Sequence, residues 1–323
     1  MIKSPDSKLD KNTRIEQLFD GISKWIHSDA LTELVRIFDG HEIDKVSLKN
    51  DDVYIDWLYN FASVWDFRKK QSNGGERWTI FDEPFVEENR DIIMSNVEQL
   101  GLIKKISPEF EPDYILPLGG ARMSNLDRPN MAKYVMEKND WKKKTIVALS
   151  GTRPLSEIEM PYIKTYSPSA KSEFEAICGG LERAFGLKPL YTEQIFAENN
   201  INSQACIRKY DEEYLDSCIY SIAAPSSEPD KRRANSYDTF VYFLEKFNIK
   251  EHDKLLLITS SIYVPFQLLK FMGLALECAI DVDCIGSDSV MKDLQLSKPS
   301  NYLQEIKSTI DAIYSLKQTY FNS

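Results

Sequence analysis

The chain has 323 residues, of which 42% are hydrophobic and 28% charged, and its formal net charge is −10. This composition is typical of a globular protein with a hydrophobic core, and the length predicts one large domain with an added module. The negative net charge argues against nonspecific binding to nucleic acid or to an anionic membrane surface. We therefore expect neither nucleic acid nor a membrane among the partners.

The N-terminus has no apolar signal core, and no window approaches the roughly 18 consecutive apolar residues of a membrane span. The five cysteines form no CxxC pair and have no histidine near them in sequence, so we expect no metal site. An odd number of cysteines without a secretory signal suits a reducing compartment. These features predict a cytoplasmic protein.

Residues 1–105 are predicted to form a helical N-terminal module packed on the main domain. Apolar residues recur at helical spacing from Ile15 to Ile22, from Leu31 to Ile37 and from Ile55 to Val64. A further helix is predicted from Glu87 to Leu100.

Residues 106–323 are predicted to form an α/β domain, because short apolar runs alternate there with segments of helix length. Such alternation favours parallel pairing and a doubly wound, mostly parallel sheet. The expected strands are Tyr114–Leu118, Thr145–Leu149, Cys218–Ala223, Lys254–Thr259 and Cys278–Ile285, and the expected helices include Pro129–Glu137, Glu173–Phe185, Tyr237–Phe247 and Pro265–Leu274.

Residues 187–216 interrupt this alternation with scattered aromatic side chains among many polar ones. We interpret them as an irregular insertion with one strand and one helix. Two roles remain open for the insertion: a lid over a binding site, or a surface excursion without function.

In an open α/β sheet, ligands bind outside the carboxyl ends of the strands, so the residues that follow each strand are the candidate site. Gly119 and Gly120 follow the first strand and allow close backbone approach. Arg122 and Arg128 come next and offer guanidinium donors suited to phosphate or carboxylate. The alternative interpretation is a tight turn between a strand and a helix.

Ser150, Gly151, Thr152 and Arg153 follow the second strand. The hydroxyl and backbone N–H groups are candidate ligand donors, and Arg153 is a second candidate anion contact. Glu157 is a candidate catalytic residue that orients a ligand hydroxyl or acts as a base. Alternatively, Glu157 is an ordinary acidic residue in the first turn of a helix.

A basic cluster follows the third strand, where Arg232 and Arg233 precede a predicted helix start at Asn235. A helix N-terminus flanked by arginines is a good anion site. Asp238, in the first turn, is the second candidate catalytic residue. The alternative is a solvated basic loop beside a well-capped helix.

The fourth strand ends in Thr259 and Ser260, candidate hydroxyl donors, and Tyr263 follows as part of an aromatic wall. None of the three histidines lies at a predicted strand end. Acid or base chemistry therefore falls to carboxylates, and the candidates are Glu157, Glu159, Glu173 and Asp238.

Four segments, LPLGGAR, LSGTRPLSEIE, RRANSYDT and LLLITSSIYVPFQ, resemble in order and spacing the pattern of the SanA/ElyC/YdcF-like proteins (domain of unknown function 218). The resemblance covers about Asp113 to Gly286, with Thr152, Ser236 and Tyr263 at positions where the family pattern differs. It implies a Rossmann-like α/β/α sandwich. It also implies a nucleotide-like ligand such as S-adenosylmethionine, or a role in envelope polysaccharide metabolism.

Together these observations predict a protein that binds a small anionic, nucleotide-like or phosphorylated ligand at the strand ends. The leading hypothesis is a transferase or hydrolase acting on that ligand. Two alternatives remain open: a ligand sensor without turnover, and an interaction protein that uses its helical N-terminal module. The cofactor is unknown from the residues themselves.

Overall fold

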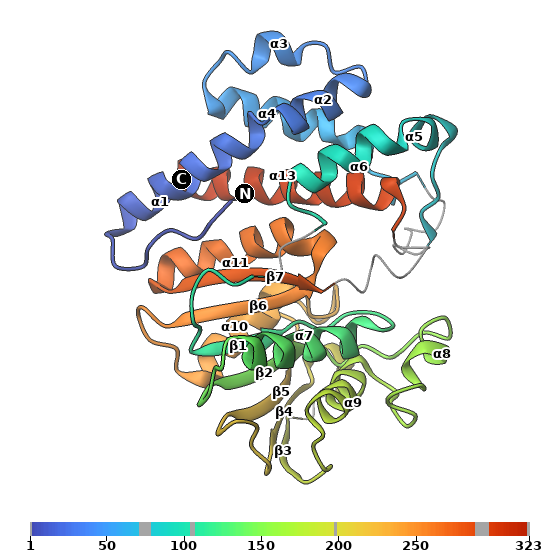
Figure 1. Ribbon diagram of the computed structural model, residues 1–323, viewed down its shortest axis with the longest axis vertical. Helices are drawn as coiled ribbons and strands as arrows, with labels where there is room; N and C mark the ends of the chain where they lie inside the picture. The colour runs from blue at the N-terminus through green and yellow to red at the C-terminus, as the bar shows by residue number, and fades with distance from the viewer. Residues whose placement is uncertain (1, 71–78, 104–106, 197–198, 288–296, 322–323) are drawn as a thin grey trace. The chain divides into compact units, whose positions relative to one another are not determined.

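The computed structural model describes residues 2–70, 79–103, 107–196, 199–287 and 297–321 (Figure 1). The chain divides into two compact units. One is a helical unit of Met1–Lys105, Ser261–Glu277 and Val290–Ser323, and the other is an α/β unit of Ile106–Ser260 and Cys278–Ser289. Within the described ranges, none of the helices combines the length and apolar character needed to cross a membrane.

The helical unit joins the N-terminal helices to helices from the C-terminal third of the chain, whereas the sequence pattern assigned the latter to the α/β domain. The side chains of Asp10, Ser28 and Asn50 each accept a backbone N–H at a helix start, as N-caps do. The elements of this unit are α1 (Lys11–Ile26), α2 (Asp29–Ile37), α3 (Ile43–Val46), α4 (Asp51–Phe61), η1 (Ala62–Trp65), α5 (Pro84–Glu88), α6 (Arg90–Gln99), η4 (Ser261–Tyr263), α11 (Val264–Cys278) and α13 (Pro299–Phe321).

Helix α13 is the centre of the helical unit, and it packs against α4 and α6. Leu303, Ile306, Ile310 and Ile313 are buried on it at the three- and four-residue spacing of one helix face. Lys317, at its C-terminal end, is buried and forms ion pairs with the carboxylates of Asp52 and Asp56 on α4, at 2.7 and 2.5 Å.

The α/β unit contains a seven-stranded sheet in the order β3-β4-β5-β2-β1-β6-β7. The pairs β5–β2, β2–β1, β1–β6 and β6–β7 are parallel, which confirms a mixed α/β fold with a mostly parallel sheet. The strands are β1 (Tyr114–Pro117), β2 (Thr145–Ser150), β3 (Tyr191–Phe196), β4 (Ala205–Tyr210), β5 (Cys218–Ala223), β6 (Lys254–Ser260) and β7 (Asp281–Ser287), and the helices are α7 (Ser124–Lys138), α8 (Met160–Ile163), α9 (Glu173–Phe185) and α10 (Ser236–Phe247).

The stretch predicted as an irregular insertion forms β3 and β4, joined by a segment that includes the short helix η3 (Ile201–Ser203). These strands pair antiparallel with each other, and β4 also pairs antiparallel with β5. All six residues of β3, the strand at one edge of the sheet, are exposed. A strand that is exposed on both faces lacks the alternation of apolar and polar residues from which a strand is predicted.

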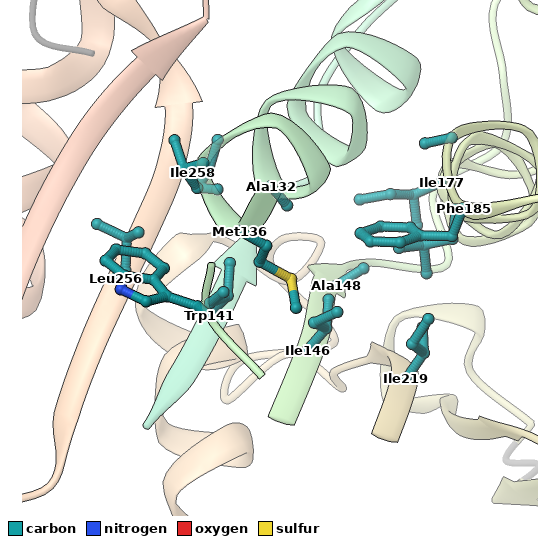
Figure 2. Close-up of a cluster of buried hydrophobic side chains, with 14 of the residues drawn as sticks. Ala132, Met136, Trp141, Ile146, Ala148, Ile177, Phe185, Ile219, Leu256 and Ile258 are labelled. Carbon is teal, nitrogen blue, oxygen red and sulfur yellow. The ribbon is translucent and has the colours of Figure 1, made fainter. Parts of the chain in front are cut away.

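Helices α7 and α9 cover one face of the sheet, and α10 covers the other. Ile115, Ile146 and Ile258 belong to the hydrophobic cluster of α7 and α9, which Figure 2 shows around Met136 and Phe185. Tyr114, the neighbour of Ile115, instead contacts Phe243 of α10. Successive strand residues point to opposite faces, so these contacts place the helices on opposite sides of the sheet.

Two sequence predictions fail at element ends. The run from Cys278 was predicted as strand, but Cys278 is the exposed last residue of α11, and β7 begins at Asp281. Pro129 was predicted to begin a helix, but α7 begins at Ser124 and contains Pro129 inside it. In both cases the helix extends beyond the residue that local rules favour as its boundary.

Candidate functional site

The carboxyl ends of β2, β1 and β6 lie side by side, because these strands are parallel neighbours in the sheet. The backbone N–H of Gly119 donates to the carbonyl of Leu149 at 2.5 Å, which joins the end of β1 to β2. The N–H of Leu118 donates to the carbonyl of Ile258 at 2.9 Å, which joins the end of β1 to β6. The Gly-Gly, Ser-Gly and Thr-Ser corners therefore share one edge of the sheet.

The turn after β1 is held by Asn125, a fully buried residue in the first turn of α7. Its side-chain amide accepts from the N–H of Gly120 at 2.9 Å and donates to the carbonyl of the same residue at 2.7 Å. Arg122 lies in this turn with a φ of 53°, in the left-handed region that costs a residue other than glycine roughly 1 kcal/mol or more. The turn is thus fixed in an unfavourable backbone conformation.

Arg128 connects the ends of β1 and β6 from α7. Its guanidinium donates to the carbonyls of Leu118 and Gly119 at 2.7 and 2.5 Å, and to the hydroxyl of Ser260 at 3.2 Å. Arg128 is buried, and a Cβ on Gly120 would lie 2.9 Å from its Nη1. Arg128 was predicted to contact an anion, but its hydrogen bonds to Leu118, Gly119 and Ser260 hold the ends of β1 and β6 together.

The corner after β2 is more open. Space surrounds Gly151, since a Cβ added there would meet nothing within 4 Å. The backbone N–H groups of Gly151 and Thr152 have no hydrogen-bond partner among the residues that the structure describes. Ser150 is buried and donates its hydroxyl to the carbonyl of Ile222 at 3.0 Å, and Thr152 donates to the carbonyl of Ile201 at 3.1 Å. Gly151 and Thr152 thus offer two backbone donors at the sheet edge.

Arg153 lies between two carboxylates. Its Nη1 and Nη2 donate to both oxygens of Glu159 at 2.7 and 2.8 Å, and its Nε donates to Oε2 of Glu173 at 2.8 Å. Burial would raise the pKa of Glu159, but hydrogen bonds from Arg153 and Ser156 lower it below its ordinary value. These carboxylates raise the pKa of Arg153 despite its burial. The positive charge of Arg153 is therefore balanced by two carboxylates within the fold.

Glu173 is the residue of this group that approaches the strand ends most closely. A Cβ on Gly119 would lie 2.5 Å from its Oε1, so the carboxylate lies directly against the turn after β1. No described residue donates a hydrogen bond to Oε1, whereas Oε2 accepts from Arg153. Glu173 was one of four carboxylates predicted as acid or base candidates. The prediction favoured Glu157 over Glu173, but Glu157 is exposed.

The third predicted corner forms a separate cluster at the start of α10. Arg232 donates to both carboxylate oxygens of Asp238 at 2.5 and 3.2 Å, and Asp238 also accepts from the backbone N–H of Asn235 at 2.8 Å. Burial would raise the pKa of Asp238, but the hydrogen bonds from Arg232, Ser227 and Asn235 lower it to about 2. A carboxylate with so low a pKa is a poor base at neutral pH.

The remaining candidates occupy different environments. Arg233 is exposed, whereas Arg122 is buried with its guanidinium carbon 4.9 Å from the ring centre of Tyr162. Thr259 is fully buried, and its hydroxyl has no partner among the described residues. Tyr263 ends η4, in the helical unit.

The structure therefore brings together the candidates on β1, β2 and β6 and keeps the α10 cluster as a group of its own. Asn125 and Glu173 complete the first group. Asn125 lies only five residues from Gly120, whereas Glu173 reaches the turn after β1 through the packing of a distant helix, which the sequence does not reveal. Among the described residues, no cluster of three or more His, Cys, Asp or Glu side chains could hold a metal ion.

Comparison with known proteins found similarity to proteins other than those that the motifs suggested. The model for the Rv3785 N-terminal domain matches residues 10–101. The uncharacterized protein Rv3785 of Mycobacterium tuberculosis and the uncharacterized protein Mb3814 of Mycobacterium bovis are each 29% identical to the chain, over 92% of this chain and 88% of theirs. The similarity thus extends across both units. No solved structure matches the chain.

The predicted resemblance to SanA/ElyC/YdcF-like proteins is therefore wrong. The family model that matches is the Rv3785 N-terminal domain, and the relatives include the uncharacterized protein Rv3785 itself. The four segments that suggested the resemblance are strand ends and helix starts with the residues that join them. Glycine, serine and threonine serve the turns between such elements in many α/β sheets, so their order does not identify a family.

Proposed function

We propose that the α/β unit binds a small anionic, nucleotide-like or phosphorylated ligand at the carboxyl ends of β1, β2 and β6. We also propose that its sheet is Rossmann-like and doubly wound. The parallel strands lie in the order β5-β2-β1-β6-β7. Counted along the chain among these five strands alone, this order is 3-2-1-4-5, which is the order of dinucleotide-binding sheets. In that arrangement the winding reverses between β1 and β6, and ligands bind at this reversal.

The observation that carries the proposal is the coincidence of this reversal with the Gly119–Gly120 turn. The turn is fixed by Asn125, and its neighbour Arg122 has a left-handed φ of 53°. Backbone strain of this kind is concentrated at ligand sites, where the surrounding structure maintains it. The N–H groups of Gly151 and Thr152, which no described residue accepts from, add donors of the type that bind phosphate.

Glu173 offers a carboxylate for turnover at the same place, so transfer or hydrolysis is the reaction class we propose for a bound phosphorylated substrate. A sensor without turnover would use the same site and would differ only in releasing the ligand unchanged. S-adenosylmethionine was suggested only by the incorrect resemblance, and it serves here as one probe among several.

The test is calorimetric titration of the full chain with inorganic phosphate, ATP, S-adenosylmethionine and ribose 5-phosphate. Substitution Gly151→Leu fills the open space after β2, and because an added Cβ there meets nothing within 4 Å, the fold should remain intact. We expect it to weaken binding at least about tenfold, which is about 1.4 kcal/mol. Product analysis of the same mixtures separates an enzyme from a sensor.

The matched control is Gly21→Leu in α1, where an added Cβ also meets nothing within 4 Å. It should bind every probe as the natural chain does. Absence of binding by all probes, or equal binding by Gly151→Leu and the natural chain, would contradict the proposal.

A further inference from the structure

The Glu159–Arg153–Glu173 chain of ion pairs suggests what kind of ligand the site accepts. We infer that Oε1 of Glu173 accepts hydrogen bonds from ligand hydroxyl groups, so that the ligand is a polyhydroxylated phosphate of the ribose or sugar type. This inference rests on the proposed function and makes it more specific.

Glu159 is the fixed end of the chain. It is fully buried, and its carboxylate accepts two hydrogen bonds from Arg153 and two from Ser156, at 2.7 to 2.9 Å. A buried ion pair contributes little net stability, because desolvation of both charges offsets their attraction. What the pair does provide is a single orientation for the Arg153 guanidinium. Glu159 is therefore a positioning residue.

Arg153 transmits this orientation to Glu173. Its Nε binds Oε2 of Glu173 at 2.8 Å, and the two side chains are 16% and 17% exposed. Holding one carboxylate oxygen fixes the direction of the other. Oε1 is thereby held against the turn after β1, where the absence of a side chain on Gly119 lets the carboxylate approach.

An ionised carboxylate oxygen only accepts hydrogen bonds, so Oε1 needs donors. No donor to it comes from the described residues, and hydroxyl groups of a ligand would supply them. The negative charge of Glu173 would repel a phosphate at the same place. The phosphate should therefore lie toward the Gly151 and Thr152 amides, and the hydroxyl-bearing part toward Glu173.

The experiment compares four phosphates on the full chain by calorimetric titration: inorganic phosphate, methyl phosphate, glycerol 3-phosphate and ribose 5-phosphate. Ribose 5-phosphate should bind at least about tenfold more tightly than methyl phosphate, since hydrogen bonds to a charged acceptor are the strong ones. In Glu173→Gln, which keeps the shape but removes the charge, we expect this preference to fall severalfold while the affinity for inorganic phosphate is unchanged or higher.

Glu245→Gln, an exposed position on α10, is the matched control and should keep the full preference. Equal affinity for methyl phosphate and ribose 5-phosphate, or an undiminished preference in Glu173→Gln, would overturn the inference while leaving the proposed anion site in place. Failure of all four phosphates to bind, together with failure of ATP and S-adenosylmethionine, would instead overturn the proposed function itself.

Discussion

At the scale of single residues, the arginines that a sequence marks as anion contacts are largely committed to partners inside the protein. Arg153 pairs with Glu159 and Glu173, and Arg232 pairs with Asp238. The N-cap Asn235 could be predicted, because capping depends on neighbours along the chain. The pairing of Arg153 with Glu173 could not, because it depends on how a distant helix packs.

Asp238 gives a prediction for pH dependence. Its pKa falls from 3.8 in the unfolded chain to about 2 in the fold, so the ionised form stabilises the fold above pH 4 and loses that effect as the pH falls toward 2. Asp238→Asn should therefore lower the free energy of unfolding at pH 7 by about 2 kcal/mol. Urea unfolding between pH 7 and pH 3 measures the difference, which should shrink below pH 4.

Asp211→Asn is the control, because Asp211 is exposed and its side chain forms no ion pair within the described residues. Its free energy of unfolding should follow that of the natural chain across the whole range. A deficit in Asp238→Asn that is the same at pH 7 and pH 3 would refute the low pKa of Asp238.

At the scale of elements, segments with strong local signals were predictable and those without were not. Helix α9 was predicted with its observed bounds, since Ser172 caps its start and Gly186 ends it in a left-handed conformation. The β3–β4 pair was missed, because β3 is exposed along its whole length. Arg128 and Asn125, which hold the turn after β1, both belong to α7. The start of α7 at Ser124 was also missed, because the helix was predicted to begin at Pro129.

The contact of α9 with α7 gives a second prediction. Pro129 has no N–H to donate to the carbonyl of Asn125 four residues earlier. Gly180 of α9 lies against that carbonyl, so closely that an added Cβ would be 1.8 Å from the oxygen. Gly180→Ala should therefore lower the free energy of unfolding by about 3 kcal/mol or more, since backbone cannot move aside as a side chain can.

Gly179→Ala in the same helix is the comparison. Its added Cβ would lie 2.3 Å from the hydroxyl and 2.4 Å from the Cβ of Ser167, which belongs to the loop between α8 and α9 and can shift more easily than the helical backbone of Asn125. Denaturant unfolding should thus show a smaller loss for Gly179→Ala than for Gly180→Ala. The reverse order would show that α7 and α9 do not pack as described.

At the scale of the whole molecule, the two compact units do not correspond to the two consecutive segments, 1–105 and 106–323, into which the sequence pattern divides the chain. Residues from both ends of the chain share the core of the helical unit, as the ion pairs of Lys317 with Asp52 and Asp56 show. Periodicity reports which face of a helix is buried but not which distant helix buries it. Removal of residues 1–105 would therefore expose α13, and point substitutions are the cleaner test of where a ligand binds.

The central claim is that an anion binds where β1, β2 and β6 end. The most direct measurement is a titration of the full chain with inorganic phosphate, followed through the backbone amide resonances in ¹H–¹⁵N correlation spectra. We predict saturable shifts that are largest at Gly151 and Thr152 and smaller at Gly119 and Gly120. Shifts centred on Arg232 and Arg233 at the start of α10, or no saturable shifts at all, would contradict the account.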